Sequence, residues 1–210
     1  MRQWIKRMMC LVCAIGCLMT QTFAYDRTIA IDYSDKQALN PNSAYHFYKD
    51  KDCANFVSQC LYSGKMKKDS VWYTTNKLGK FYGSDAWANA NALKNYLKNN
   101  ARAKLLSAWT RKGTDGQYPT YAYKNNSSNL TASNTGKVVV FYDWTGNGTM
   151  NHSSFYVADK AKSKCEDDGK NVTGDLINAH TTNRYRAIWN RDRANKNRDT
   201  TRIYAFELNV

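Results

Sequence analysis

Apolar residues recur at helical spacing in two segments of the first half of the chain. Within residues 53–62, apolar side chains stand at positions i, i+3, i+4, i+7 and i+8, namely Cys53, Phe56, Val57, Cys60 and Leu61. Residues 84–100 repeat the pattern with Trp87, Ala90, Leu93 and Leu97. A stripe with this period is typical of a helix that buries one face. The sequence therefore predicts two amphipathic helices that pack against a core.

The second half of the chain changes to the two-residue period of β-strands. β-Branched and aromatic residues concentrate in four segments, 137–144, 152–159, 175–182 and 201–208. Helices followed by strands predict an α+β fold, with N-terminal helices packed on an antiparallel β-sheet. The chain has no internal repeat and no proline-rich linker, so we expect a single domain over residues 25–210.

Residues 1–24 have the composition of a secretory signal peptide. Three basic residues precede an apolar run that is too short to span a membrane, and a plausible cleavage site follows at Ala24. A competing cut before Cys17 would give a lipoprotein, but Ala14 stands where such signals usually carry leucine. No second apolar run of membrane length follows. We therefore predict a protein secreted to the extracellular or periplasmic space, with no transmembrane segment.

The chain that remains after the leader is strongly basic. The leader holds three of the 31 lysine and arginine residues and none of the 17 acidic residues, so an excess of 11 positive charges remains. Polyanions outside the cytoplasm are wall polymers, acidic glycans and lipid head groups rather than nucleic acid. We expect a monomer whose partners are peptidoglycan or anionic cell-wall polymers, although solubility alone would explain the charge equally well.

Three cysteines remain after the leader: Cys53, Cys60 and Cys165. An odd number leaves at least one thiol without a partner in the chain. Cys53 follows Asp52, a favoured helix N-cap, so it falls in the first helical turn, where backbone N–H groups and the helix dipole stabilise a thiolate. Its place on the apolar stripe equally suits a small buried side chain. Because the Asp52 carboxylate would oppose a thiolate, a reactive Cys53 requires a base.

Three histidines could supply that base: His46, His152 and His180. His152 begins a predicted strand after a glycine-rich turn, and strand alternation places it on the same face as Ser154. On the next predicted strand, Asn178 and His180 share a face by the same period. If these strands pair, a base and a polar orienting group would stand opposite the start of the helix. His46 has the surroundings of a packed or surface side chain.

Three segments of the chain resemble a known family. They are DCANFVSQCL at 52–61, VVVFYDWTGNGTMNHSSFYV at 138–157 and LINAHTTNR at 176–184. These segments are similar to the secreted bacterial putative amidase domain family, papain-like cysteine hydrolases akin to NlpC-type and CHAP peptidoglycan hydrolases. The likeness covers most of residues 25–208, and the cysteine segment is its most specific part.

The resemblance implies a papain-like (NlpC/CHAP-type) fold and cleavage of amide or peptide bonds in peptidoglycan. It implies that Cys53 is the nucleophile and His152 the general base, with a third polar residue on the next strand. The family's His-Thr motif points to His180 for this third place, while other papain-like hydrolases equally favour Asn178. Two other functions stay open: an inactive basic wall-binding module, and a secreted toxin or acyltransferase with the same dyad.

Metal and disulfide chemistry change this interpretation little. The cysteine and histidine spacings match no zinc motif, and we expect no metal and no cofactor. The turn at 143–152 keeps the outline of half a calcium loop, but Asp143 is its only carboxylate, so a tight turn is favoured. Cys60 and Cys165 could form a disulfide that leaves Cys53 as the free thiol.

Overall fold

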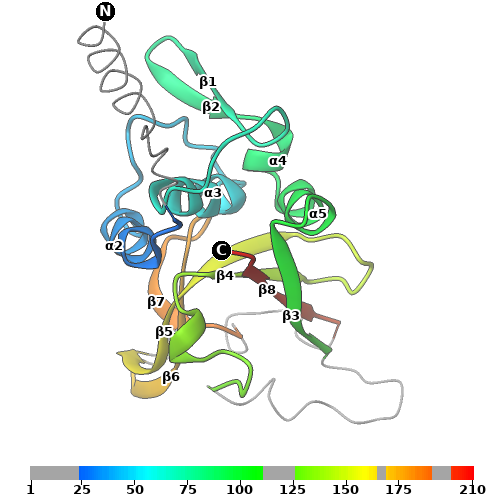
Figure 1. The fold of residues 1–210 in the computed structure, drawn as a ribbon. Coiled ribbons are helices and arrows are strands. Elements are labelled where there is room, and N and C mark those ends of the chain that lie inside the picture. The colour runs from blue at the N-terminus through cyan, green and yellow to red at the C-terminus, as the bar shows by residue number, and fades with distance from the viewer. Residues whose placement is uncertain (1–23, 111–125, 165–168, 191–199) are drawn as a thin grey trace, which may run out of the picture.

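The computed structural model describes residues 24–110, 126–164, 169–190 and 200–210. These residues form an α+β fold in which the helices lie on one side of a six-stranded sheet (Figure 1). The α+β class predicted from the sequence is confirmed. The helical elements are α2 (Arg27–Gln37), α3 (Cys53–Ser63), α4 (Asp85–Ala88), α5 (Ala90–Asn99) and the 3₁₀ turn η2 (Ala132–Asn134).

The sheet brings together strands from distant parts of the chain. Its order is β3–β8–β4–β5–β6–β7, and every neighbouring pair is antiparallel. The strands are β3 (Ala103–Thr110), β4 (Val138–Asp143), β5 (His152–Lys164), β6 (Asn171–Ala179), β7 (Arg184–Ile188) and β8 (Arg202–Leu208). A separate hairpin of β1 (Thr74–Lys77) and β2 (Lys80–Gly83) projects away from the sheet (Figure 1). The four strands expected from the sequence are thus confirmed as β4, β5, β6 and β8.

Helix α3 is buried on nearly every side, polar residues included. The Ser58 hydroxyl donates to the Trp87 carbonyl oxygen at 2.8 Å, and the Asn55 side-chain oxygen accepts from the Trp87 indole at 2.9 Å. The Gln59 side-chain oxygen accepts from the Tyr33 hydroxyl at 2.6 Å. Buried polar groups are tolerated when each has such a partner. The polar residues of the motif around Cys53 therefore anchor the helix inside the core.

The prediction of a single helix over residues 84–100 is wrong in one respect. The structure divides this segment into α4 and α5 at Asn89, whose backbone is extended (φ −115°, ψ 128°). The Asn89 side chain accepts hydrogen bonds from the Asn91 and Ala92 N–H groups at 2.9 and 3.0 Å. Asparagine is among the best N-cap residues, so it starts a new helix here.

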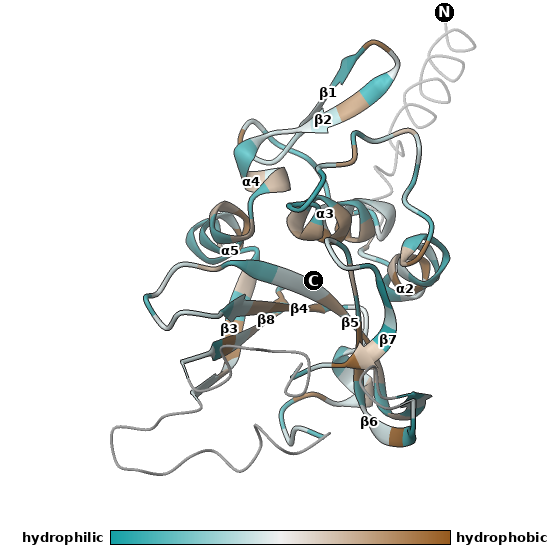
Figure 2. Ribbon diagram, turned by 180° about the vertical axis from the view of Figure 1, so that it is seen from behind, coloured by the Kyte–Doolittle hydropathy of each residue, from teal (hydrophilic) through white to brown (hydrophobic). Residues whose placement is uncertain are grey.

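Apolar side chains cover both faces of the central strands. Val139, Phe141 and Phe155 belong to the core cluster that includes α3, while Val140 and Tyr142 belong to a second cluster on the other face. Figure 2 shows the hydrophobic colouring on α3 and on the middle of the sheet. Because side chains alternate along a strand, the position of a residue in β5 decides whether its side chain faces α3.

Asp175 of β6 gives the fold a pH dependence. Its carboxylate accepts hydrogen bonds from the Ser127 N–H at 2.5 Å and the Lys160 N–H at 3.2 Å. Burial, with a further contribution from Asp159, outweighs these bonds and raises the pKa of Asp175 from 3.8 to about 6. The folded state therefore holds this proton more tightly than the unfolded state. The resulting stabilisation is complete below pH 3.8 and is lost as the pH rises through about 6.

We expect Asp175→Asn to flatten the fall in the free energy of unfolding between about pH 4 and pH 6, because asparagine does not titrate. Urea denaturation followed by circular dichroism across this range measures the effect in both proteins. An unchanged pH slope in the variant would show that other groups set the dependence.

Candidate active site

Cys53 is the first residue of α3, and its side chain is 5% exposed. The thiol lies close to Ser153 at the start of β5 and to Thr181, but the buried Ser153 hydroxyl has no hydrogen-bond partner among the described residues. Burial raises the pKa of the Cys53 thiol, and these neighbours act in the opposite direction. Burial thus disfavours the thiolate form of Cys53 in the free protein. A nucleophilic thiolate at this position requires a general base.

Asp52 does not cap α3 in the way that the sequence predicted. The residue stands at the N-cap position, and its carbonyl oxygen accepts from the Phe56 N–H at 2.9 Å, but its carboxylate makes no capping bond. One carboxylate oxygen accepts from the Tyr48 N–H and the Asn55 side chain, each at 2.9 Å. The other lies 2.6 Å from His180 Nδ1. These partners occupy the carboxylate, so it does not accept from the backbone N–H groups of the first turn of α3.

His180 follows β6 and forms a buried pair with Asp52. Both side chains are 1% exposed, and the imidazole stacks on Phe56 with 4.1 Å between ring centroids. Its Nε2 lies 2.9 Å from the Gln37 carbonyl oxygen, on the opposite side from Asp52. Since a carboxylate and a carbonyl both accept, both ring nitrogens act as donors. This geometry suits a buried pair of an imidazolium and a carboxylate.

Asn178 of β6 makes a different set of contacts. Its side-chain nitrogen donates to the Ser34 hydroxyl at 2.9 Å and to Asp35 Oδ1 at 2.8 Å, and its oxygen accepts from the Arg186 N–H at 2.6 Å. These bonds join β6 to α2 and β7. The hydrogen bonds described for Asn178 and His180 thus run to groups other than the His152 imidazole. The expectation that one of them orients His152 stays a prediction.

His152 begins β5, directly before the residue that touches the thiol. The predicted pairing of β5 with β6 is confirmed. The other edge of β5 pairs with β4, where His152 lies opposite Tyr142. The imidazole lies 5.4 Å from the Tyr142 ring and stacks with the Trp144 ring at 5.9 Å. Tyr142 belongs to the cluster on the sheet face opposite α3. The His152 ring therefore points toward that face, while Ser153 points toward Cys53.

The sequence analysis did not identify two hydroxyl residues that lie beside the thiol. Ser153 and Thr181 contact the Cys53 thiol, and each directly follows one of the two candidate histidines, His152 and His180. The repeated histidine–hydroxyl dipeptide is the one signal that could have indicated them. In the structure both dipeptides lie near the start of α3.

Asp143 organises the glycine-rich turn that precedes His152. The buried carboxylate accepts from the N–H groups of Gly146, Asn147 and Gly148 at 2.7, 3.2 and 2.7 Å. The two glycines have φ of 73° and 89°, a region that side chains rarely adopt. The structure thus shows the tight turn that the sequence favoured over a calcium loop. In the part of the chain described, no three potential metal-ligating side chains cluster.

Several sequence predictions lie wholly or partly outside the described residues. These include the signal peptide, with its alternative lipoprotein cysteine, and Cys165. The other member of the suggested disulfide, Cys60, is a fully buried free thiol. His46 is packed, with its ring stacked 4.3 Å from that of Tyr82. Over the residues that are described, no helix combines the length and apolar character needed to cross a membrane.

Comparison with known proteins identifies the family. The "putative amidase domain" family matches residues 24–204, and the chain belongs to this family. The uncharacterized protein YjcM of Bacillus subtilis (strain 168) is 44% identical over 86 residues, which are 41% of this chain and 19% of YjcM. The uncharacterized protein YhbB of the same strain is 28% identical over 144 residues, 66% of this chain and 39% of YhbB. The chain thus spans less than half the length of either relative. No solved structure matches it.

Proposed function

We propose that this protein is a secreted, papain-like cysteine amidase that cleaves amide or peptide bonds of peptidoglycan. The observation that carries the proposal is the position of Cys53 at the first turn of α3, which packs on β5 close to Ser153, the neighbour of His152. A thiol at a helix start, close to the strand residue that follows a histidine, offers the residue types of a nucleophile and its base. Membership of the amidase family supports hydrolysis, and the basic composition supports an anionic wall substrate.

The proposed reaction proceeds through a thioester on Cys53. His152 takes the thiol proton, and the sulfur attacks the carbonyl carbon of the amide, which gives a tetrahedral oxyanion. The C–N bond then breaks as His152 donates the proton to the leaving amine, and water releases the acid from the thioester. Because the His152 ring packs beside Trp144 on the face of the sheet opposite α3, this step requires the backbone at the start of β5 to rearrange as substrate binds. Catalytic groups in free enzymes are often less well aligned than in complexes.

The first turn of α3 suits stabilisation of the oxyanion. Because the Asp52 carboxylate is bound to Tyr48, Asn55 and His180, no side chain caps this turn. Uncapped N–H groups and the positive end of the helix dipole favour a developing negative charge. We assign the third position of the site to His180 rather than Asn178, because His180 binds the residue directly before the nucleophile. In this role His180 is a positioning residue for the start of α3.

The function is tested by incubating the purified protein with peptidoglycan and identifying the released ends by mass spectrometry. We expect the wild-type protein to release new amine and carboxylate ends. In His152→Ala the rate should be lower by a factor of about 10² or more, because the general base is lost. His46→Ala is the matched control, since it truncates a histidine that packs on Tyr82. It should keep the wild-type rate.

Each outcome of this experiment separates one part of the proposal from the others. Absence of new ends would contradict the substrate. Equal rates in the wild type and His152→Ala would contradict the role of His152. Transfer of the acyl group to an added amine in place of water would indicate an acyltransferase.

A further inference from the structure

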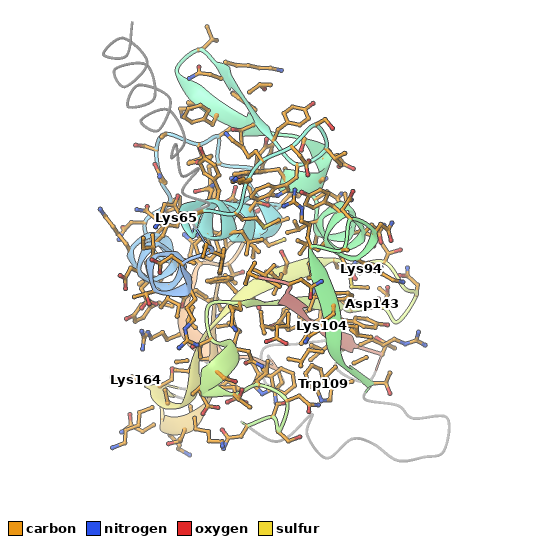
Figure 3. All side chains as sticks on the ribbon, viewed as in Figure 1. Lys65, Lys94, Lys104, Trp109, Asp143 and Lys164 are labelled. Carbon is orange, nitrogen blue, oxygen red and sulfur yellow. The ribbon has the colours of Figure 1, made fainter. Side chains whose placement is uncertain are left out.

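A pocket of about 270 Å³ lies between α5, β3 and β8, beside the turn that leads into β5. Lys94 and Lys98 of α5 and Lys104 of β3 contribute its charged lining, and Figure 3 shows Lys94 and Lys104 on these neighbouring elements. Met150 and Phe206, both nearly buried, contribute its apolar lining. The pocket thus joins a cationic part to an apolar part, and we refer to it as the lysine pocket.

The positive charge of the lysine pocket is only partly balanced. Lys94 and Lys98 are one helical turn apart and repel each other. Burial and the charge of Lys98 lower the pKa of Lys94, although Asp143 acts in the opposite direction. Lys104 pairs with Glu207 at 3.4 Å. The lining that the structure describes contains no acidic side chain, so a bound anion would relieve the repulsion on α5.

Asp143 does not cancel this charge by a direct contact. Its carboxylate is fully buried and accepts from three backbone N–H groups of its own turn. A carboxylate with its lone pairs used in this way lies inside the turn rather than in the pocket. Its field favours the charged form of Lys94 and leaves the ammonium group available to a ligand.

The lysine pocket lies on the same side of the sheet as the candidate nucleophile. Met150 and Phe206 belong to the core cluster that contains Cys53. Met150 stands two residues before His152, which corresponds to about 7 Å of extended chain. Its N–H donates to the Asn91 side chain of α5 at 3.2 Å, so the turn is fixed against the helix that carries the lysines. A ligand held here would extend toward the start of β5.

We propose that the lysine pocket binds the free carboxylate of a peptide substrate, with a small apolar side chain of the same residue against Met150 and Phe206. This inference names the substrate class of the proposed amidase and rests on that function. Ammonium groups bind a carboxylate through charge-assisted hydrogen bonds. The apolar lining favours a peptide end over an inorganic phosphate or a sugar acid, which offer no apolar group to bury.

Binding is measured by titration calorimetry with the Cys53→Ser protein, which lacks the nucleophile. The ligands are a tetrapeptide ending in alanine with a free carboxylate, the same peptide as its C-terminal amide, and inorganic phosphate. We expect the dissociation constant of the acid to be lower than that of the amide by a factor of about 10 or more. The double substitution Lys94→Gln and Lys98→Gln should remove this preference. The control is the double substitution Lys162→Gln and Lys164→Gln, at two exposed positions at the far end of β5. It removes the same charge and should keep the preference for the acid.

The outcomes keep the pocket and the amidase function apart. Equal binding of acid and amide, tighter binding of phosphate than of the acid, or equal losses in both double variants would overturn the lysine pocket. Hydrolysis that continues at the wild-type rate after the Lys94 and Lys98 substitutions would retain the amidase and reject the pocket. Lysine-dependent binding of the acid without any hydrolysis would retain the pocket and reject the amidase.

Discussion

Replacing Cys53 with serine is expected to lower the rate of amide hydrolysis by about 10³-fold or more, because the change removes the nucleophile. The fold should persist, since a hydroxyl of similar size can keep the contacts with Ser153 and Thr181. The rate of release of new ends from peptidoglycan measures the first effect. Urea denaturation measures the second.

Cys60→Ala is the matched control for this substitution. Cys60 is also a buried free thiol of α3, two turns beyond Cys53. Its truncation should cost on the order of 1 kcal/mol of stability, because a small apolar group leaves the core. The rate of the folded protein should stay unchanged. Retained hydrolysis in Cys53→Ser, or lost hydrolysis in folded Cys60→Ala, would show that the nucleophile is assigned wrongly.

Breaking the buried pair of Asp52 and His180 is expected to have the largest effect on stability. His180→Ala leaves the Asp52 carboxylate, 1% exposed, without the partner that lies 2.6 Å away. Asp52→Asn leaves the imidazole facing an uncharged group. Each single change should lower the free energy of unfolding by about 3–5 kcal/mol, because it strands one buried charge. Urea denaturation at neutral pH gives the values.

A double-mutant cycle distinguishes the pair from simple loss of packing. Asp52→Asn combined with His180→Ala should cost less than the sum of the two single losses, because no buried charge remains without a partner. His46→Ala, in a partly exposed histidine, should cost much less than His180→Ala. Additive losses in the cycle, or similar losses at His46 and His180, would argue against a buried ion pair.

The strongly periodic elements of the fold could be predicted from the sequence, and the weakly periodic ones could not. The stripe of α3 and the β-branched runs of β4 and β5 identify buried elements directly. Helix α2 buries only Ala30 and Ser34, so it leaves almost no apolar pattern. The break between α4 and α5 depends on Asn89 acting as an N-cap, whereas the apolar stripe over residues 84–100 favours one continuous helix. Both features follow from tertiary packing rather than from local periodicity.

The candidate site was predictable where its residues are neighbours in the sequence. The adjacency of Asp52 and Cys53 and the strand that begins at His152 are local features. The pairing of Asp52 with His180 joins residues 128 positions apart, and it turns the expected N-cap into a buried ion pair. Strand alternation shows that His152 and Ser153 point to opposite faces of the sheet. It does not show which of the two faces packs on α3, and this depends on how β5 pairs with β4.

The most direct test of Cys53 as the nucleophile follows its alkylation by iodoacetamide together with the loss of hydrolysis. At successive times, peptide mapping gives the alkylated fractions of Cys53 and Cys60, and digestion of peptidoglycan gives the residual rate. We expect the residual rate to fall in proportion to unmodified Cys53, while Cys60, which is fully enclosed, reacts more slowly. Full hydrolysis by protein whose Cys53 is completely alkylated would contradict this assignment.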